Sequence, residues 1–142
     1  MNRRIKKITV ADVKYIALRL AKEFMAWNEP IPEFETRYPN VLESCLAVPF
    51  QTYNRKPLYA RLVGKASILF YLMIKNHPFE NGNKRIAVMA LLLFLLRNNK
   101  WLGVFPEELY RVAVLVAESN SKAKDKILED LKGFFKEGVV DF

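Results

Sequence analysis

The chain has 142 residues, 51% of them hydrophobic, and a formal charge of +8. A chain of this size and apolar content can bury a core without metal or disulfide support, so we expect a single domain over residues 1–142. The only cysteine, Cys45, excludes an internal disulfide, which favours a buried apolar role and a cytoplasmic location.

The positive charge favours anionic ligands, but its distribution excludes several classes of partner. Only "NRRIKK" near the N terminus forms a dense cationic cluster, and a solvated arm is its simplest interpretation. The apolar run from Ile86 to Leu96 is shorter than the roughly 20 residues that a membrane-spanning helix needs. Neither a membrane nor a nucleic acid is therefore an expected partner.

The first half of the chain predicts two helices and a hairpin. Thr9 is suited to cap a helix in residues 9–27, whose apolar residues recur on one face. The two prolines of "NEPIPEF" end it, and a short helix is expected between Pro39 and Pro49. Residues 51–59, "QTYNRKPLY", are the only stretch for which we predict β structure.

The second half predicts four more helices. The first covers residues 60–76, because Pro78 pushes the preceding His77 out of the α region. The next runs from about Asn83 to Asn99 and is apolar on every side, so we expect it to be the most buried helix. Pro106 begins a further helix, and an amphipathic helix lies near the C terminus. The predicted class is all-α, with about six helices around one central helix.

The polar segment before the apolar helix reads "NHPFENGNKR". Gly82 permits a tight turn, and the first amides of the following helix can bind an anion such as phosphate. Lys84 and Arg85 lie in the first helical turn, where the dipole disfavours cations unless an anion binds between them. Asn83 can cap the helix or bond a phosphate oxygen, and His77 can take a proton from an attacking hydroxyl.

Together these residues predict phosphate transfer, with a base beside a positively charged phosphate site. The alternative is a simple turn between two helices. In that interpretation His77 and Asn83 are caps, Gly82 makes the turn, and the two cations are solvated. The residue types alone favour neither interpretation.

The segment "HPFENGNKR" resembles the signature of the Fic/Doc superfamily, whose Fic branch carries H-P-F-x-[D/E]-G-N-G-R. Lysine in place of the last glycine is similar to the Doc (death-on-curing) toxins. Three longer segments also resemble Doc sequences, in the same order: "YPNVLESCLAVPFQTY", "LYARLVGKASILFYLMIKNHPF" and "KRIAVMALLLFLLRNN". The resemblance covers most of the chain and implies an all-α Fic fold with the signature loop between two central helices.

The resemblance also implies a role for each residue of the loop. His77 would be the general base toward a target hydroxyl, and Phe79 the buried anchor. The anion hole and the phosphate contacts would come from Gly82, Asn83, Lys84 and Arg85. A flap that aligns the target polypeptide would contain the docking residues Thr52, Tyr53, Asn54 and Arg55.

Doc proteins transfer the terminal phosphate of ATP, with magnesium, to a threonine of a translation elongation factor, whereas Fic proteins with glycine at the lysine position transfer AMP. Lys84 therefore implies a phosphotransferase, and an AMP transferase is the alternative. The usual acidic magnesium ligand is replaced by Asn81, a weaker neutral ligand, and Glu80 is the other candidate. A weakened, binding or regulatory Fic-fold protein is a third interpretation.

Many Fic proteins carry a self-inhibitory helix of the form [S/T]-x-x-x-E-[G/N]. Glu80 and Glu137 precede Asn and Gly, but Asn76 and Gly133 stand four places before them. No built-in inhibitor is expected, which implies control by a separate antitoxin protein.

Overall fold

The computed structural model describes residues 4–24 and 30–142. Its first helical run consists of α1 (Val10–Asp12), a π-helical turn (Val13–Ala17) and α2 (Leu18–Phe24). The other long helices are α3 (Pro39–Ala47), α4 (Arg61–Lys75), α5 (Asn83–Arg97), α6 (Pro106–Glu118) and α7 (Lys124–Gly138). With the first run counted as one helix, the described residues contain six, and the prediction of an all-α fold is confirmed.

The predicted N-cap of the first helix is also confirmed. The Thr9 hydroxyl accepts a hydrogen bond from the Asp12 amide at 3.1 Å, and the Asp12 carboxylate accepts one from the Thr9 amide at 2.7 Å. Arg97, the last residue of α5, donates to the same carboxylate at 2.6 Å. Partial burial opposes ionisation, but these hydrogen bonds hold the pKa of Asp12 below its usual value. One carboxylate thus joins the start of α1 to the end of α5.

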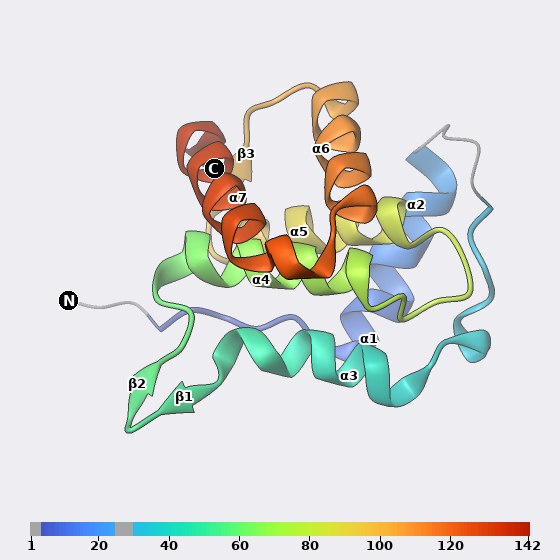
Figure 1. Ribbon diagram of the computed structural model, residues 1–142. Coiled ribbons are helices and arrows are strands. Elements are labelled where there is room, and N and C mark those ends of the chain that lie inside the picture. The colour runs from blue at the N-terminus through green and yellow to red at the C-terminus, as the bar shows by residue number, and fades with distance from the viewer. Residues whose placement is uncertain (1–3, 25–29) are drawn as a thin grey trace.

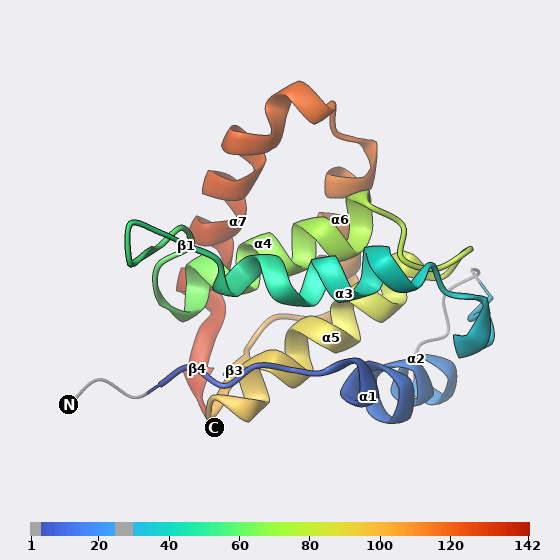
Figure 2. The same ribbon diagram turned by 90° about the horizontal axis from the view of Figure 1, so that it is seen from below.

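Helices α4 and α5 lie side by side through the middle of the molecule (Figure 1). Helix α3 covers one side of α4, α6 and α7 cover the other, and the α1–α2 run packs against α5 (Figure 2). Among the described residues, no helix combines the length and the apolar character needed to cross a membrane.

The prediction that residues 83–99 form the most buried helix is wrong in two respects. Helix α5 ends at Arg97, and every residue of α4 from Gly64 to Ile74 is buried. Helix α5 leaves Leu96 exposed and Met89 partly exposed. An all-round apolar composition shows that a helix can be buried, but the neighbours that cover it are set by the tertiary structure.

One apolar cluster connects all the long helices. Its largest fully buried side chains include Phe70, Phe79, Phe94 and Phe135. Cys45 of α3 is also fully buried, and burial raises the pKa of its thiol to about 12. The expected role of Cys45 as a small apolar core residue is confirmed.

In the part of the chain that the structure describes, the short strands form two separate two-stranded sheets. Strand β1 (Thr52–Tyr53) pairs antiparallel with β2 (Lys56–Pro57), as predicted for residues 51–59. Strand β3 (Lys100–Leu102) pairs with β4 (Val139–Asp141), so the prediction that no other segment has β structure is wrong. The second pair joins residues that are far apart in the sequence, and three-residue strands carry no recognisable alternation.

Candidate active site

The polar loop between α4 and α5 has the predicted boundaries. Helix α4 ends at Lys75, and His77 adopts a left-handed conformation with φ of 49°. Pro78 accounts for the helix end, because it excludes the α conformation for the residue before it. The His77 side chain is exposed, and α5 begins at Asn83. The structure therefore presents the histidine at a helix exit, directly before the start of the next helix.

Asn83 closes the loop on itself. Its side-chain oxygen accepts a hydrogen bond from the Phe79 amide at 3.0 Å, and its side-chain nitrogen donates to the Phe79 carbonyl at 2.9 Å. The same nitrogen lies 3.5 Å from Nδ1 of His77. Of the two roles considered for Asn83, capping α5 is wrong, because the backbone of Phe79 occupies its amide and Gly82 holds the N-cap position without a side-chain cap.

The segment before α3 also packs against the loop and supports it. Gly82 has φ of 74°, and a Cβ atom on it would lie 2.8 Å from the carbonyl oxygen of Pro30. The Tyr38 amide donates to the Pro78 carbonyl at 2.9 Å, and the ring of Phe34 lies 6.4 Å from that of Phe79. No local pattern in the sequence connects residues 30–38 with the loop, so their contact with it could not be predicted.

The two cations in the first turn of α5 lie in different environments. Lys84 is partly exposed, whereas Arg85 is buried and donates to the Ala21 carbonyl of α2 at 2.5 Å. Arg85 thus also connects the start of α5 to the N-terminal helical run. Lys84 is the cation nearer to solvent at the amide-rich end of the helix, where an anion would bind.

Asn81 is the better placed of the two candidate magnesium ligands. Its side-chain oxygen is buried and has no hydrogen-bond partner among the described residues, whereas Glu80 is exposed. No group of three or more His, Cys, Asp or Glu side chains in the described ranges could hold a metal by itself. Magnesium is usually bound by one or two carboxylates and completes its shell with phosphate and water, and the unpaired Asn81 oxygen would supply one neutral ligand to such an ion.

The structure does not bring the expected flap to the loop. The expected docking residues lie in β1 and the turn after it, and all four are exposed: Thr52, Tyr53, Asn54 and Arg55. They precede α4, and His77 follows it. A helix of 15 residues is about 22 Å long, and both views place the hairpin and the loop at opposite ends of the molecule (Figures 1 and 2).

The loop therefore brings together four features. They are an exposed proton acceptor (His77), a helix N terminus that begins at a glycine (Gly82), a nearby lysine (Lys84) and a buried amide oxygen without a partner in the described part of the chain (Asn81). The model of the Fic/DOC family matches residues 7–95, more than half of the chain, and the match includes the whole loop. The chain belongs to the Fic/DOC family. Its all-α architecture agrees with the Fic fold, and Fic/DOC proteins generally transfer nucleotide-derived groups to other proteins.

No curated protein and no solved structure matches this Fic/DOC chain. The part after the family match, residues 96–142, supplies α6, α7 and the β3–β4 pair. Both helices pack against α4, and α6 also packs against α5. This C-terminal part completes the burial of the two helices that carry the loop.

Proposed function

We propose that this Fic/DOC protein is a Doc-type toxin that transfers the terminal phosphate of ATP to a hydroxyl of a target protein. The observation that carries the proposal is Lys84 in the first turn of α5, directly after Gly82 and Asn83. A lysine there fills the space that a glycine would leave for a polyphosphate close to the backbone, and it adds a charged phosphate contact. The proposed target is a translation elongation factor, and the proposed partner is a separate antitoxin protein.

His77 performs the proton transfer in this proposal. Its imidazole takes the proton of the target hydroxyl, and the oxygen attacks the γ-phosphorus of ATP. The bond between that phosphorus and the bridging oxygen breaks, ADP leaves with the electron pair, and a phosphate ester remains on the target. The exposure of His77 allows a hydroxyl on a macromolecule to reach it.

The helix N terminus and Lys84 stabilise the charge of the transferring phosphoryl group. The start of α5 is held by the buried Phe79 and by the two hydrogen bonds between the Asn83 side-chain amide and the Phe79 backbone. Asn81 would hold magnesium together with phosphate oxygens, with Glu80 as the second candidate ligand. When bound, magnesium would neutralise part of the phosphate charge.

Labelled ATP tests which phosphate moves. We expect γ-label to reach the target protein and α-label not to reach it. Lys84→Gly should weaken phosphate transfer and lower the binding free energy of ATP by roughly 1.5–3 kcal/mol, the contribution of one charged hydrogen bond. ATP binding is measured separately by calorimetry, and Lys84→Arg is the matched variant that keeps the charge.

Transfer of α-label by the unmodified protein would contradict phosphate transfer and support an AMP transferase on the same fold. If neither label reaches a target although ATP binds, the protein is a binding or regulatory member of the family.

Asn81→Asp is expected to lower the magnesium concentration required for half-maximal transfer by roughly tenfold, because an anionic oxygen replaces a neutral one at a site for a hard divalent cation. Magnesium titrations of both proteins measure this shift, and Glu80→Gln is the control. If Asn81→Asp changes nothing and Glu80→Gln abolishes transfer, Glu80 is the metal ligand.

A further inference from the structure

Much of the positive charge of the chain gathers at the end of the molecule opposite His77. Two adjoining cavities of about 940 and 740 Å³ share Arg4, Ile5 and Lys6 in their walls. Among the described residues, seven cationic side chains and one carboxylate line them, a surplus of six in a chain whose net charge is +8. We call the two cavities together the basic groove.

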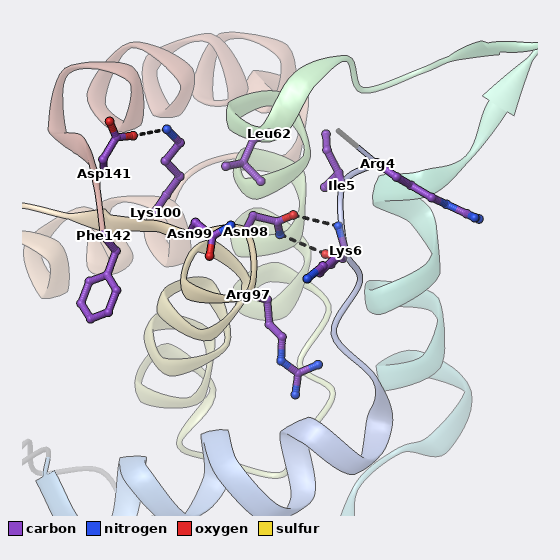
Figure 3. Close-up of a pocket in the computed structure, with 10 residues that line it drawn as sticks. All are labelled: Arg4, Ile5, Lys6, Leu62, Arg97, Asn98, Asn99, Lys100, Asp141 and Phe142. Atoms are coloured by element: carbon purple, nitrogen blue, oxygen red, sulfur yellow. Dashed lines mark hydrogen bonds and ion pairs between the residues drawn. The ribbon is translucent and has the colours of Figure 1, made fainter. Parts of the chain in front are cut away.

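Five of the seven cations form no ion pair with a described residue. They are Arg4, Lys6, Lys7, Arg61 and Lys65. The other two have partners. Arg97 binds Asp12 at 2.6 Å, and Lys100 binds Asp141, as Figure 3 shows. The groove therefore holds a surplus of positive charge that its own carboxylates do not neutralise.

One of the five cations is buried. The Lys65 side chain belongs to a residue that is only 7% exposed, and its ammonium donates to the Tyr59 carbonyl at 2.5 Å. Burial lowers the pKa of Lys65, because the charged form loses hydration. A bound anion beside the groove would stabilise the charged form of this side chain.

Asn98, the residue directly after α5, holds one wall of the groove in place. The side chain of Asn98 accepts a hydrogen bond from the Lys6 amide at 2.8 Å and donates one to the Lys6 carbonyl at 3.0 Å (Figure 3). Arg4, Lys6 and Lys7 are exposed, as expected for a solvated arm, but the backbone at Lys6 is held by Asn98. Residues 2 and 3 of the cluster lie outside the described residues. Apolar side chains lie between the cations, including Ile5, Leu62 and Phe50.

We propose that the basic groove binds an acidic polypeptide segment in which apolar side chains alternate with carboxylates. The unpaired cations match the carboxylates, and Ile5 and Leu62 match the apolar side chains between them. Single-stranded nucleic acid binds by stacking successive bases on aromatic faces. Two aromatic rings from the described part of the chain line the groove: Phe142 is exposed, whereas the ring of Phe50 is contacted by the ammonium groups of Lys7 and Lys65, at 5.0 and 5.3 Å from its centroid. The groove thus offers one open ring and not a series of them, which makes nucleic acid the poorer match.

The groove lies at the end of α5 that is remote from the loop, so an acidic segment bound there leaves His77 open to a target hydroxyl. The proposal does not depend on which group the loop transfers. The same surface could recruit a target or a regulator, provided that the partner carries such an acidic segment.

Fluorescence anisotropy with the full chain and short labelled peptides tests the proposal. A peptide of alternating Glu and Leu should bind, and binding should weaken as salt is added. Peptides with Gln in place of Glu, or Ser in place of Leu, should bind more weakly. The double variant Lys6→Glu, Arg61→Glu should bind the Glu–Leu peptide at least about tenfold more weakly, because two attractions become repulsions.

The matched control is Arg111→Glu, Lys122→Glu, which changes the net charge equally at two exposed cations outside the groove. It should bind like the unmodified protein, as should His77→Ala, and thermal unfolding shows that each variant is folded. If both double variants bind the Glu–Leu peptide equally weakly, the net charge of the protein alone explains the loss of binding, and the proposal is overturned. It is also overturned if the Gln peptide binds as well as the Glu peptide, or if a short single-stranded RNA binds more tightly than the Glu–Leu peptide.

Discussion

His77→Ala is expected to lower the rate of group transfer by about 10²–10⁴-fold while the protein remains folded. The variant removes the proton acceptor, and the side chain it removes is exposed and contributes little to packing. The nearest polar contact, to Asn83, is 3.5 Å long and therefore weak. Initial rates of label transfer and thermal unfolding curves, measured on the same preparations, separate the two effects.

The backbone at His77 requires a second variant as a control. Its φ of 49° lies in the left-handed region, where asparagine is tolerated better than alanine. His77→Asn therefore removes the base with less backbone strain, and it should be as inactive as His77→Ala. Full transfer activity in either folded variant would show that His77 only terminates α4.

Phe79→Ala is expected to lower the free energy of unfolding by about 3–5 kcal/mol and to reduce transfer as well. The side chain is fully buried, its ring lies 6.4 Å from that of Phe34, and its backbone holds both polar atoms of the Asn83 amide. A cavity at this position would free the loop that carries His77. Denaturant unfolding measures the stability, and label transfer is measured under conditions in which the variant is folded.

Phe135→Ala separates loop positioning from general stability. Phe135 is also fully buried, but it lies in α7 with its ring 5.6 Å from that of Phe70. We expect a similar loss of stability and nearly unchanged transfer by the folded fraction. If both variants lose transfer equally at the same folded fraction, Phe79 has no specific role in positioning the loop.

Several helix ends and the content of the loop could be predicted from the sequence. Thr9 caps the first helix, Pro78 ends the helix before the loop, and Pro106 starts α6, as expected. Each of these features depends on residues within a few positions of one another, because caps and prolines act on the adjacent turn of backbone. Because His77, Gly82 and Lys84 lie close together in the sequence, the candidate site could likewise be predicted from it.

The surroundings of that loop were decided by the tertiary structure alone. Pro30 and Tyr38 contact the loop, and Arg85 turns inward to α2, although no local pattern joins these residues to it. The same holds for the distance between the hairpin and His77, which follows from the length of α4. Contacts of this kind depend on which apolar surfaces pack together, and one sequence window does not contain both surfaces.

The charge of the protein can be divided in the same way, into what the sequence determines and what the folded structure determines. In the sequence, the net charge of +8 and the N-terminal cluster are visible, but the other cations are interspersed with acids. Packing of α4 and α5 brings Arg61 and Lys65, at the start of one helix, close to Lys6 and Arg97 beside the end of the other. Electrostatic potential depends on distance in space, so the sequence determined how much charge the protein carries, and only the folded arrangement decided where that charge is concentrated.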